Sequence, residues 1–176
     1  MADRTRALLL NESENNVNKL QKFCGLAVAI SLLAGTSFGA PFTRIDQDAK
    51  TKLAHLLDKS GYKFTKVADN VWTVPFNGKS LGEFPLLVTS VQDLIIVGVV
   101  VAKKDSMRLS PEMLQKLLRM ANDLDRVKIG IDDDGDLFLR VEVSARLFDA
   151  EELKVNFEQV AAAANDLHAA IKSFLK

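Results

Sequence analysis

The stretch from Leu94 to Ala102 constrains the fold of this chain more than any other part of the sequence. It is aliphatic at every position except Gly98. Because successive residues of a strand point to opposite faces of a sheet, this strand is apolar on both faces. Such a strand is typical of a sheet that is covered on both faces. The preceding Gln92-Asp93 pair predicts a turn, and Leu86 to Val88 predict a neighbouring strand.

Apolar residues spaced three and four apart predict three helices. The first runs from Ile45 to Ser60-Gly61, where the glycine suits a helix C-terminus. The second begins with Ser110 as N-cap and Pro111 at the first helical position. The third begins at Asp149 in a sequence that resembles a capping box. The apolar stripe of this last helix holds Leu153, Phe157, Val160, Ala164, Leu167, Ile171 and Phe174.

Alternating apolar residues predict two hairpins. In the first, Tyr62 to Val67 pair with Val71 to Phe76, and a loop follows from Asn77 to Pro85. In the second, Val127 to Ile131 pair with Leu137 to Ala145 across an acidic turn. The whole pattern predicts an α+β domain in the order α-β-β-β-α-β-β-α. We expect a mostly antiparallel sheet with helices packed on one face.

The first forty residues have the features of a targeting segment. Lys19 and Lys22 precede an uncharged stretch from Phe23 to Phe42, and the small residues Ser37 and Gly39 suit a cut ahead of Ala40. We therefore expect residues 1–40 to be a signal peptide or N-terminal targeting segment, residues 41–176 to form the domain, and the protein to be periplasmic or secreted. The segment before Lys22 is long for the charged region of a signal peptide and carries Glu12 and Glu14, so an uncleaved membrane anchor and a cytoplasmic protein with a packed helix remain alternatives. The apolar run is marginal in length for a membrane span. The single cysteine, Cys24, can form no internal disulfide.

Charge and motifs give little sign of chemistry. The 23 basic and 23 acidic residues cancel, which argues against nucleic-acid binding because a phosphate backbone is met by a basic face. The two histidines, His55 and His168, lie on predicted helices without a second ligand nearby in sequence. The basic residues Lys103, Lys104 and Arg108 are interrupted by Asp105. We predict no catalytic, cofactor-binding or metal-binding residue and no cofactor.

The acidic turn from Asp132 to Asp136 is the strongest candidate for a metal site. Several carboxylates in one short loop can chelate a hard cation such as calcium. However, the EF-hand pattern requires glycine at its sixth position and glutamate at its twelfth, and Leu137 and Val143 stand there. We interpret the segment as a hairpin turn in which Gly135 adopts a positive φ. A metal-dependent enzyme or metal-binding protein that uses this loop is kept as an alternative.

The chain from Met113 to Ile171 resembles the YbjN family of bacterial proteins. The likeness rests on residues 117–122, on residues 127–137 with the strand to Ala145, and on the helix from Asp149. The resemblance implies a fold related to type III secretion chaperones and a non-enzymatic module, often dimeric, with regulatory or chaperone-like roles. It carries over no functional residue. The targeting segment argues against a secretion-chaperone role in the cytosol.

We therefore expect a non-enzymatic protein-binding or regulatory module with a protein partner or a homodimer. A small-ligand-binding protein is a further alternative, and membrane association is expected only if the N-terminal segment is retained. If the helices cover one face of the sheet, half of the strand from Leu94 remains uncovered. The uncovered set is either Ile95, Val97, Val99 and Val101 or Leu94, Ile96, Gly98 and Val100. Either set predicts an apolar patch of the kind that marks an interface.

Overall fold

The computed structural model describes residues 42–176, with side chains from residue 48 onward. Its centre is a six-stranded sheet with the strand order β1-β2-β3-β4-β6-β5, in which all neighbours are antiparallel. β4 therefore lies in the interior of the sheet. The strands are β1 (Thr65–Ala68), β2 (Val71–Gly78), β3 (Gly82–Val91), β4 (Leu94–Ala102), β5 (Lys128–Ile131) and β6 (Leu137–Ser144).

Three helices accompany the sheet, and their predicted caps are present. The helices are α2 (Phe42–Ser60), α3 (Pro111–Asp123) and α4 (Ala150–Ile171). Ser110 Oγ accepts a hydrogen bond from the Met113 N–H at 3.3 Å, and Asp149 Oδ1 accepts one from the Glu152 N–H at 2.8 Å. Each cap satisfies a backbone donor that has no partner within the helix. Two short 3₁₀ helices, η1 (Lys104–Ser106) and η2 (Lys172–Phe174), complete the elements.

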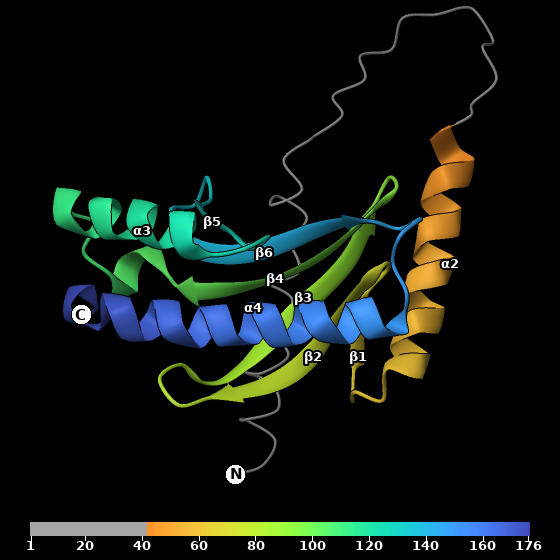
Figure 1. The fold of residues 1–176 in the computed structure, drawn as a ribbon, viewed down its shortest axis with the longest axis horizontal. Coiled ribbons are helices and arrows are strands. Elements are labelled where there is room, and N and C mark those ends of the chain that lie inside the picture. The colour runs from red at the N-terminus through yellow and green to blue at the C-terminus, as the bar shows by residue number, and fades with distance from the viewer. Residues whose placement is uncertain (1–41) are drawn as a thin grey trace, which may run out of the picture.

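Figure 1 shows α4 lying across the sheet, with α2 at one end of it and α3 near β5 and β6. The predicted α+β fold with an antiparallel sheet is confirmed. Between α2 and α3 the chain forms four strands, one more than the predicted order contains. The predicted targeting segment, residues 1–40, lies outside the described residues. Among residues 42–176, none of the helices has both the length and the apolar character that crossing a membrane requires.

The predicted loop from Asn77 to Pro85 is wrong, because β2 continues to Gly78 and β3 already begins at Gly82. Pro75 and Pro85 lie directly opposite each other in this hairpin. Neither proline has an N–H to donate, but β1 pairs with β2 only as far as Thr73, and β4 pairs with β3 only from Leu87. The prolines thus occupy positions where no neighbouring strand needs a donor, and the hairpin is not interrupted.

All three helices pack on one face of the sheet. Ile95, Val97, Val99 and Val101 of β4 belong to a single core that also contains residues of α2, α3 and α4. Ile95 and Val97 are fully buried. The other parity of β4, with Leu94, Ile96 and Val100, is partly exposed and takes no part in that core. The structure therefore decides which of the two aliphatic sets faces the helices.

Because the two faces of β4 differ, the same substitution at two adjacent residues should destabilise the fold to different extents. Val97→Lys places an unpaired ammonium group under the helices, so we expect a loss of at least about 3 kcal/mol of unfolding free energy. Ile96→Lys places it on the opposite face, where its long stem can carry the charge to solvent, so we expect a loss below about 1 kcal/mol. Urea denaturation, monitored by circular dichroism, measures the unfolding free energy of both variants. Equal losses in the two variants would contradict the assignment of the faces.

Candidate functional site: the open face of the sheet

The face of the sheet opposite the three helices, called the open face from here on, has an apolar part. Leu94, Ile96 and Val100 of β4 lie on it in the interior of the sheet. A second small cluster lies beside them, in which Val71 and Leu87 pack with Val67 and Ala68. Val71 and Leu87 are each only 4% exposed. These aliphatic side chains thus extend over β1, β2, β3 and β4, and the partly exposed ones among them lie on β1 and β4.

Charged side chains border this aliphatic region at the β5 and β6 end. Lys128 Nζ donates a hydrogen bond to Glu142 Oε2 at 2.6 Å, and Arg140 Nε lies 2.7 Å from Glu142 Oε1. The hydrogen bond from Lys128 holds the pKa of Glu142 below its usual range, Arg140 adds to this effect, and burial opposes it. The Arg140 guanidinium also lies 5.4 Å from the centre of the Phe138 ring, a cation–π distance. The side chains at this border thus contact one another and are not independent charges surrounded by water.

Two glycines allow Phe138 and Arg140 to lie close against the sheet. Gly130 pairs with Phe138, and a Cβ at Gly130 would approach the Phe138 ring to 2.4 Å. Gly98 pairs with Arg140, and a Cβ at Gly98 would lie 3.2 Å from the Arg140 Cβ. Because both neighbouring positions lack a side chain, the ring and the arginine stem occupy the space beside β6.

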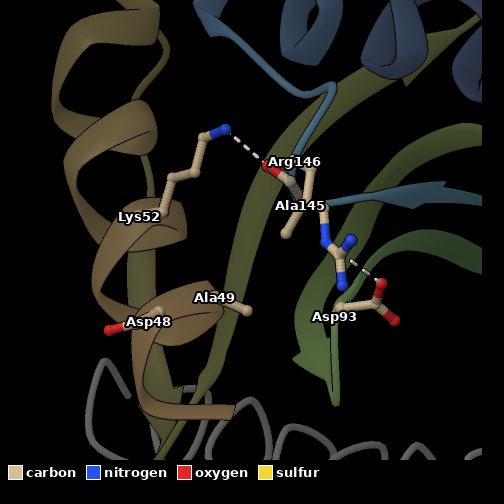
Figure 2. Close-up of a pocket in the computed structure, with 6 residues that line it drawn as sticks. All are labelled: Asp48, Ala49, Lys52, Asp93, Ala145 and Arg146. Atoms are coloured by element: carbon tan, nitrogen blue, oxygen red, sulfur yellow. Dashed lines mark hydrogen bonds and ion pairs between the residues drawn. The ribbon is translucent and has the colours of Figure 1, made fainter. Parts of the chain in front are cut away.

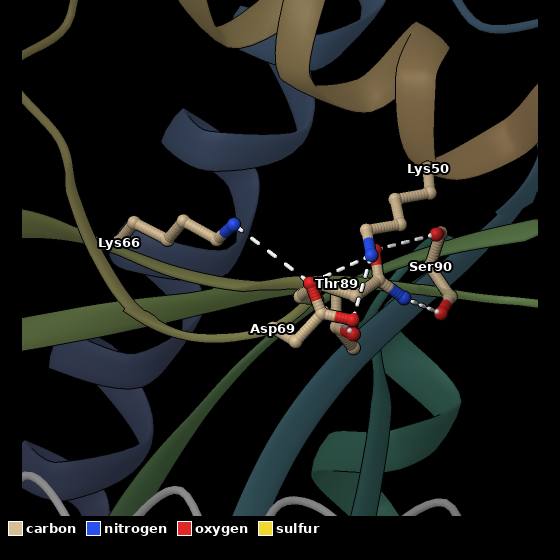
Figure 3. A network of polar contacts seen from close by, with 6 residues as sticks. Lys50, Lys66, Asp69, Thr89 and Ser90 are labelled. Carbon is tan, nitrogen blue, oxygen red and sulfur yellow. Dashed lines mark hydrogen bonds and ion pairs between the residues drawn. The ribbon is translucent and has the colours of Figure 1, made fainter. Parts of the chain in front are cut away.

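The opposite border of the open face is a turn that is held by polar contacts. The β1–β2 turn contains Asn70, whose φ is +59°. Asn70 donates from Nδ2 to the Ser90 carbonyl at 2.5 Å, accepts from Ser90 Oγ at 2.9 Å, and its own carbonyl accepts from Thr89 Oγ1 at 2.6 Å. Beside it, the Asp69 carboxylate meets Lys50 of α2 at 2.6 Å and Lys66 at 3.8 Å (Figure 3). These contacts fix the turn to β3 and α2, and they explain why Thr89 and Ser90 are buried although they are polar.

A pocket of about 230 Å³ lies where the middle of α2 meets the β3–β4 turn and the chain after β6. Figure 2 shows its lining residues, Asp48, Ala49, Lys52, Asp93, Ala145 and Arg146. Lys52 Nζ donates to the Ala145 carbonyl, and Arg146 lies 4.0 Å from Asp93. Both cations of the pocket therefore already have partners. Its volume is below the ~300 Å³ at which sites for small organic ligands begin, so it gives little support to a small-ligand-binding protein.

Two carboxylates of the acidic turn, those of Asp132 and Asp136, have structural roles. Asp136 is 3% exposed, and its Oδ1 accepts the Lys104 N–H at 2.9 Å, which ties the turn to the start of η1. Asp132 Oδ1 accepts the Asp136 N–H at 2.8 Å within the turn. Gly135 has the predicted positive φ, at +87°. Within residues 42–176 no group of three or more His, Cys, Asp or Glu side chains is placed to hold a metal ion.

The two histidines lie on different helices, and one has a role that the sequence does not reveal. His55 is exposed on α2. His168 on α4 has its Nδ1 2.9 Å from Ser80 Oγ, and the neighbouring Asn165 Oδ1 accepts the Ser80 N–H at 2.7 Å. Gly78 lies under Asn165, where a Cβ would meet Asn165 Oδ1 at 2.7 Å. These contacts dock the β2–β3 turn on α4. The basic residues Lys103, Lys104 and Arg108 are exposed and stay outside the open face.

The contact between His168 and Ser80 predicts a loss of stability in mild acid. Burial lowers the pKa of His168 and the Lys172 cation lowers it further, against a raising effect of the Ser80 backbone. The unfolded chain, with a histidine pKa near 6.5, therefore takes up the proton first as the pH falls. This part of the stability is present above about pH 6.5 and is lost as the pH falls through the lower pKa of the folded state.

Urea denaturation midpoints at pH 7.5 and pH 5.5 measure this effect. We expect His168→Gln to have a smaller difference between the two midpoints than the unsubstituted chain. His55→Gln, at an exposed position, is the control and should retain the original difference. An unchanged difference in His168→Gln would show that another group causes the pH dependence.

Comparisons with known proteins confirm the likeness to the YbjN family at the level of the fold. No protein family model and no curated protein matches the sequence. Among solved structures, a chain of the heterodimeric ExoU–SpcU complex from the type III secretion system of Pseudomonas aeruginosa matches with a TM-score of 0.51 and 19% identity, over 68% of this chain and 97% of that chain. YbjN from E. coli, whose role as a transcription regulator is itself a hypothesis, matches with a TM-score of 0.50 and 17% identity, over 72% of this chain and 94% of that chain. The chain thus has the α+β fold that these two bacterial proteins share.

Proposed function

We propose that this chain is a non-enzymatic protein-binding or regulatory module that holds a partner protein on the open face of its sheet. The observation that carries the proposal is the set of partly exposed aliphatic side chains on β4. Leu94, Ile96 and Val100 remain partly exposed on a strand in the interior of the sheet, opposite the face that the helices cover. An aliphatic surface on a central strand gains free energy when a partner removes it from water.

The arrangement around these residues supports a protein partner. Protein interfaces commonly have an apolar centre and a polar, solvent-accessible rim. Here the aliphatic region lies between the Lys128, Arg140 and Glu142 group on one side and the Asn70 turn on the other. The charged group offers hydrogen-bonding atoms at the border, where they stay in contact with water.

The comparisons support the same class of function without identifying the partner. One structural neighbour was solved as part of a heterodimeric complex, and the other is discussed as a regulator. Neither is described as an enzyme. Together with the structural use of the acidic turn, this favours a binding module over a metal-dependent enzyme.

The proposal predicts that one substitution on the open face weakens partner binding while the fold survives. Tagged full-length chain is used to retain proteins from an extract of its native host, and the retained protein is then purified and titrated. We expect Ile96→Lys to weaken its binding at least about tenfold, as expected when a charge enters an apolar contact worth more than about 1.4 kcal/mol.

Val155→Lys is the matched control, because Val155 is an aliphatic residue that is 43% exposed on α4, on the helical side. It should bind as the unsubstituted chain does. The open face would be refuted as the binding site if the partner bound Ile96→Lys with full affinity, or if the unsubstituted chain retained no partner at all.

We further propose that the module is exported and acts in the periplasm or outside the cell. Support comes from Lys19, Lys22 and the uncharged stretch that follows them. α2 begins at Phe42, so a cut ahead of Ala40 would leave every helix and strand that the structure describes intact.

Intact mass measurement of the protein from its native host tests the export. We expect a chain that begins near Ala40. Leu32→Arg, which places a charge in the apolar stretch, should leave the precursor uncut. A mature chain that still carries residues 1–22 would contradict the proposal.

A further inference from the structure

The pocket beside α2 adjoins the open face at the end of two of its strands. Asp93 directly precedes Leu94 of β4, and Ala145 directly follows Ser144 of β6. Leu94 and Ser144 are partners across the sheet, so both lie on the open face. The pocket therefore begins one residue beyond that face. A partner segment that lies along β4 and continues past Leu94 would reach it.

Three segments of the chain hold the pocket in shape. The Ala145 N–H donates to the Asp93 carbonyl at 2.5 Å, which joins the chain after β6 to the β3–β4 turn. Lys52 Nζ donates to the Ala145 carbonyl, which joins α2 to the same residue (Figure 2). Ala49 and Ala145, which line the pocket, are 3% and 6% exposed. Because these walls are already in place, little ordering has to accompany binding.

The size and the lining of the pocket favour one aromatic side chain as its occupant. A cavity of about 150 Å³ holds a benzene molecule, so a volume of about 230 Å³ has room for one ring. The lining surface is mostly apolar, and its acidic and basic side chains are equal in number, so a charged group would meet no excess of opposite charge. We infer, resting on the proposed function, that this pocket takes an aromatic side chain of the protein that binds the open face.

Arg146 gives a reason why a ring fits better than an aliphatic side chain. The Arg146 side chain is 76% exposed, and its Nε lies 4.0 Å from Asp93 Oδ2, which is beyond hydrogen-bond distance. The guanidinium can therefore turn over a ring in the pocket without breaking a hydrogen bond to Asp93. A cation over the face of a ring is attracted to it. The carboxylates at the rim also offer acceptors to a tyrosine hydroxyl or a tryptophan N–H.

Titration of the full chain with small neutral probes, followed by NMR, tests the inference without the partner. We expect N-acetyltyrosinamide to shift the methyl resonances of Ala49 and Ala145 and to saturate at about millimolar concentration, because one side chain supplies only part of an interface. N-acetylleucinamide should bind about threefold more weakly, since it lacks the attraction between ring and cation. No shift with the tyrosine probe, or equal binding of the two probes, would overturn the inference.

Two substitutions assign the shifts to the pocket. Ala145→Leu places a larger side chain in the pocket and should abolish the Ala49 shift. Arg146→Gln, at an exposed position, should leave the melting temperature unchanged and reduce binding of the tyrosine probe to that of the leucine probe, so it serves as the test if Ala145→Leu does not fold. Ala162→Leu, at an exposed position of α4, is the matched control and should bind like the unsubstituted chain. Undiminished binding to Arg146→Gln would contradict the inference.

Binding of the partner separates the pocket from the open face. We expect Ala145→Leu to weaken it at least about tenfold, because a filled pocket excludes a side chain that anchors the interface, whereas Ala162→Leu should not. A partner that is weakened by Ile96→Lys but not by Ala145→Leu would overturn the pocket and leave the open face as the binding site. The reverse result, with the tyrosine probe still bound, would support the pocket and refute the open face.

Discussion

Burial of the odd-numbered side chains of β4 is the interaction on which the rest of the structure depends. Ile95, Val97 and Val99 form the floor of a single core, and residues from all three helices pack onto it. α4 crosses the sheet above this floor, and α2 packs on both the sheet and α4 (Figure 1). Burial of aliphatic side chains is the main favourable term in folding. Since the strand keeps its second aliphatic set on the opposite face, one segment provides both the core of the fold and the proposed contact with a partner.

Local sequence signals predicted the elements well because their causes are local. The serine cap of α3 and the proline at its first position, the aspartate cap of α4 and the glycine of the acidic turn each act within a few residues, and all are present. The hairpin of β2 and β3 was missed because Asn77-Gly78 is typical of a turn and Pro85 breaks a strand in isolation. The observed hairpin contains two opposed prolines, Pro75 and Pro85. They are tolerated only because β1 and β4 do not pair with those positions, which is a property of the whole sheet.

Other features could not be predicted, because they depend on contacts between residues far apart in sequence. The pattern of β4 is the same on both parities, so only the placement of the helices decides that Ile96 is on the open face. The apolar residues of α3 form one broad face in sequence, and the fold divides it into a buried and an exposed stripe. Ser80 and His168 meet although no motif links them, since one is in a turn and the other on the last helix. Asp136 is a buried acceptor for a backbone N–H from η1. The sequence does not reveal this role, because Asp136 stands in a run of similar acidic residues.

The two glycines that lie beside β6 determine the surface shape of the open face. Because Gly98 and Gly130 carry no side chain, Arg140 and Phe138 lie low against their neighbouring strands instead of standing upright as a ridge. A methyl group at either position would lift the arginine or the ring, although neither glycine has a side chain with which to touch a partner. The shape offered to a partner is thus encoded at positions that make no side-chain contact with it. A scan that replaces only the contacting side chains by alanine would overlook these two residues.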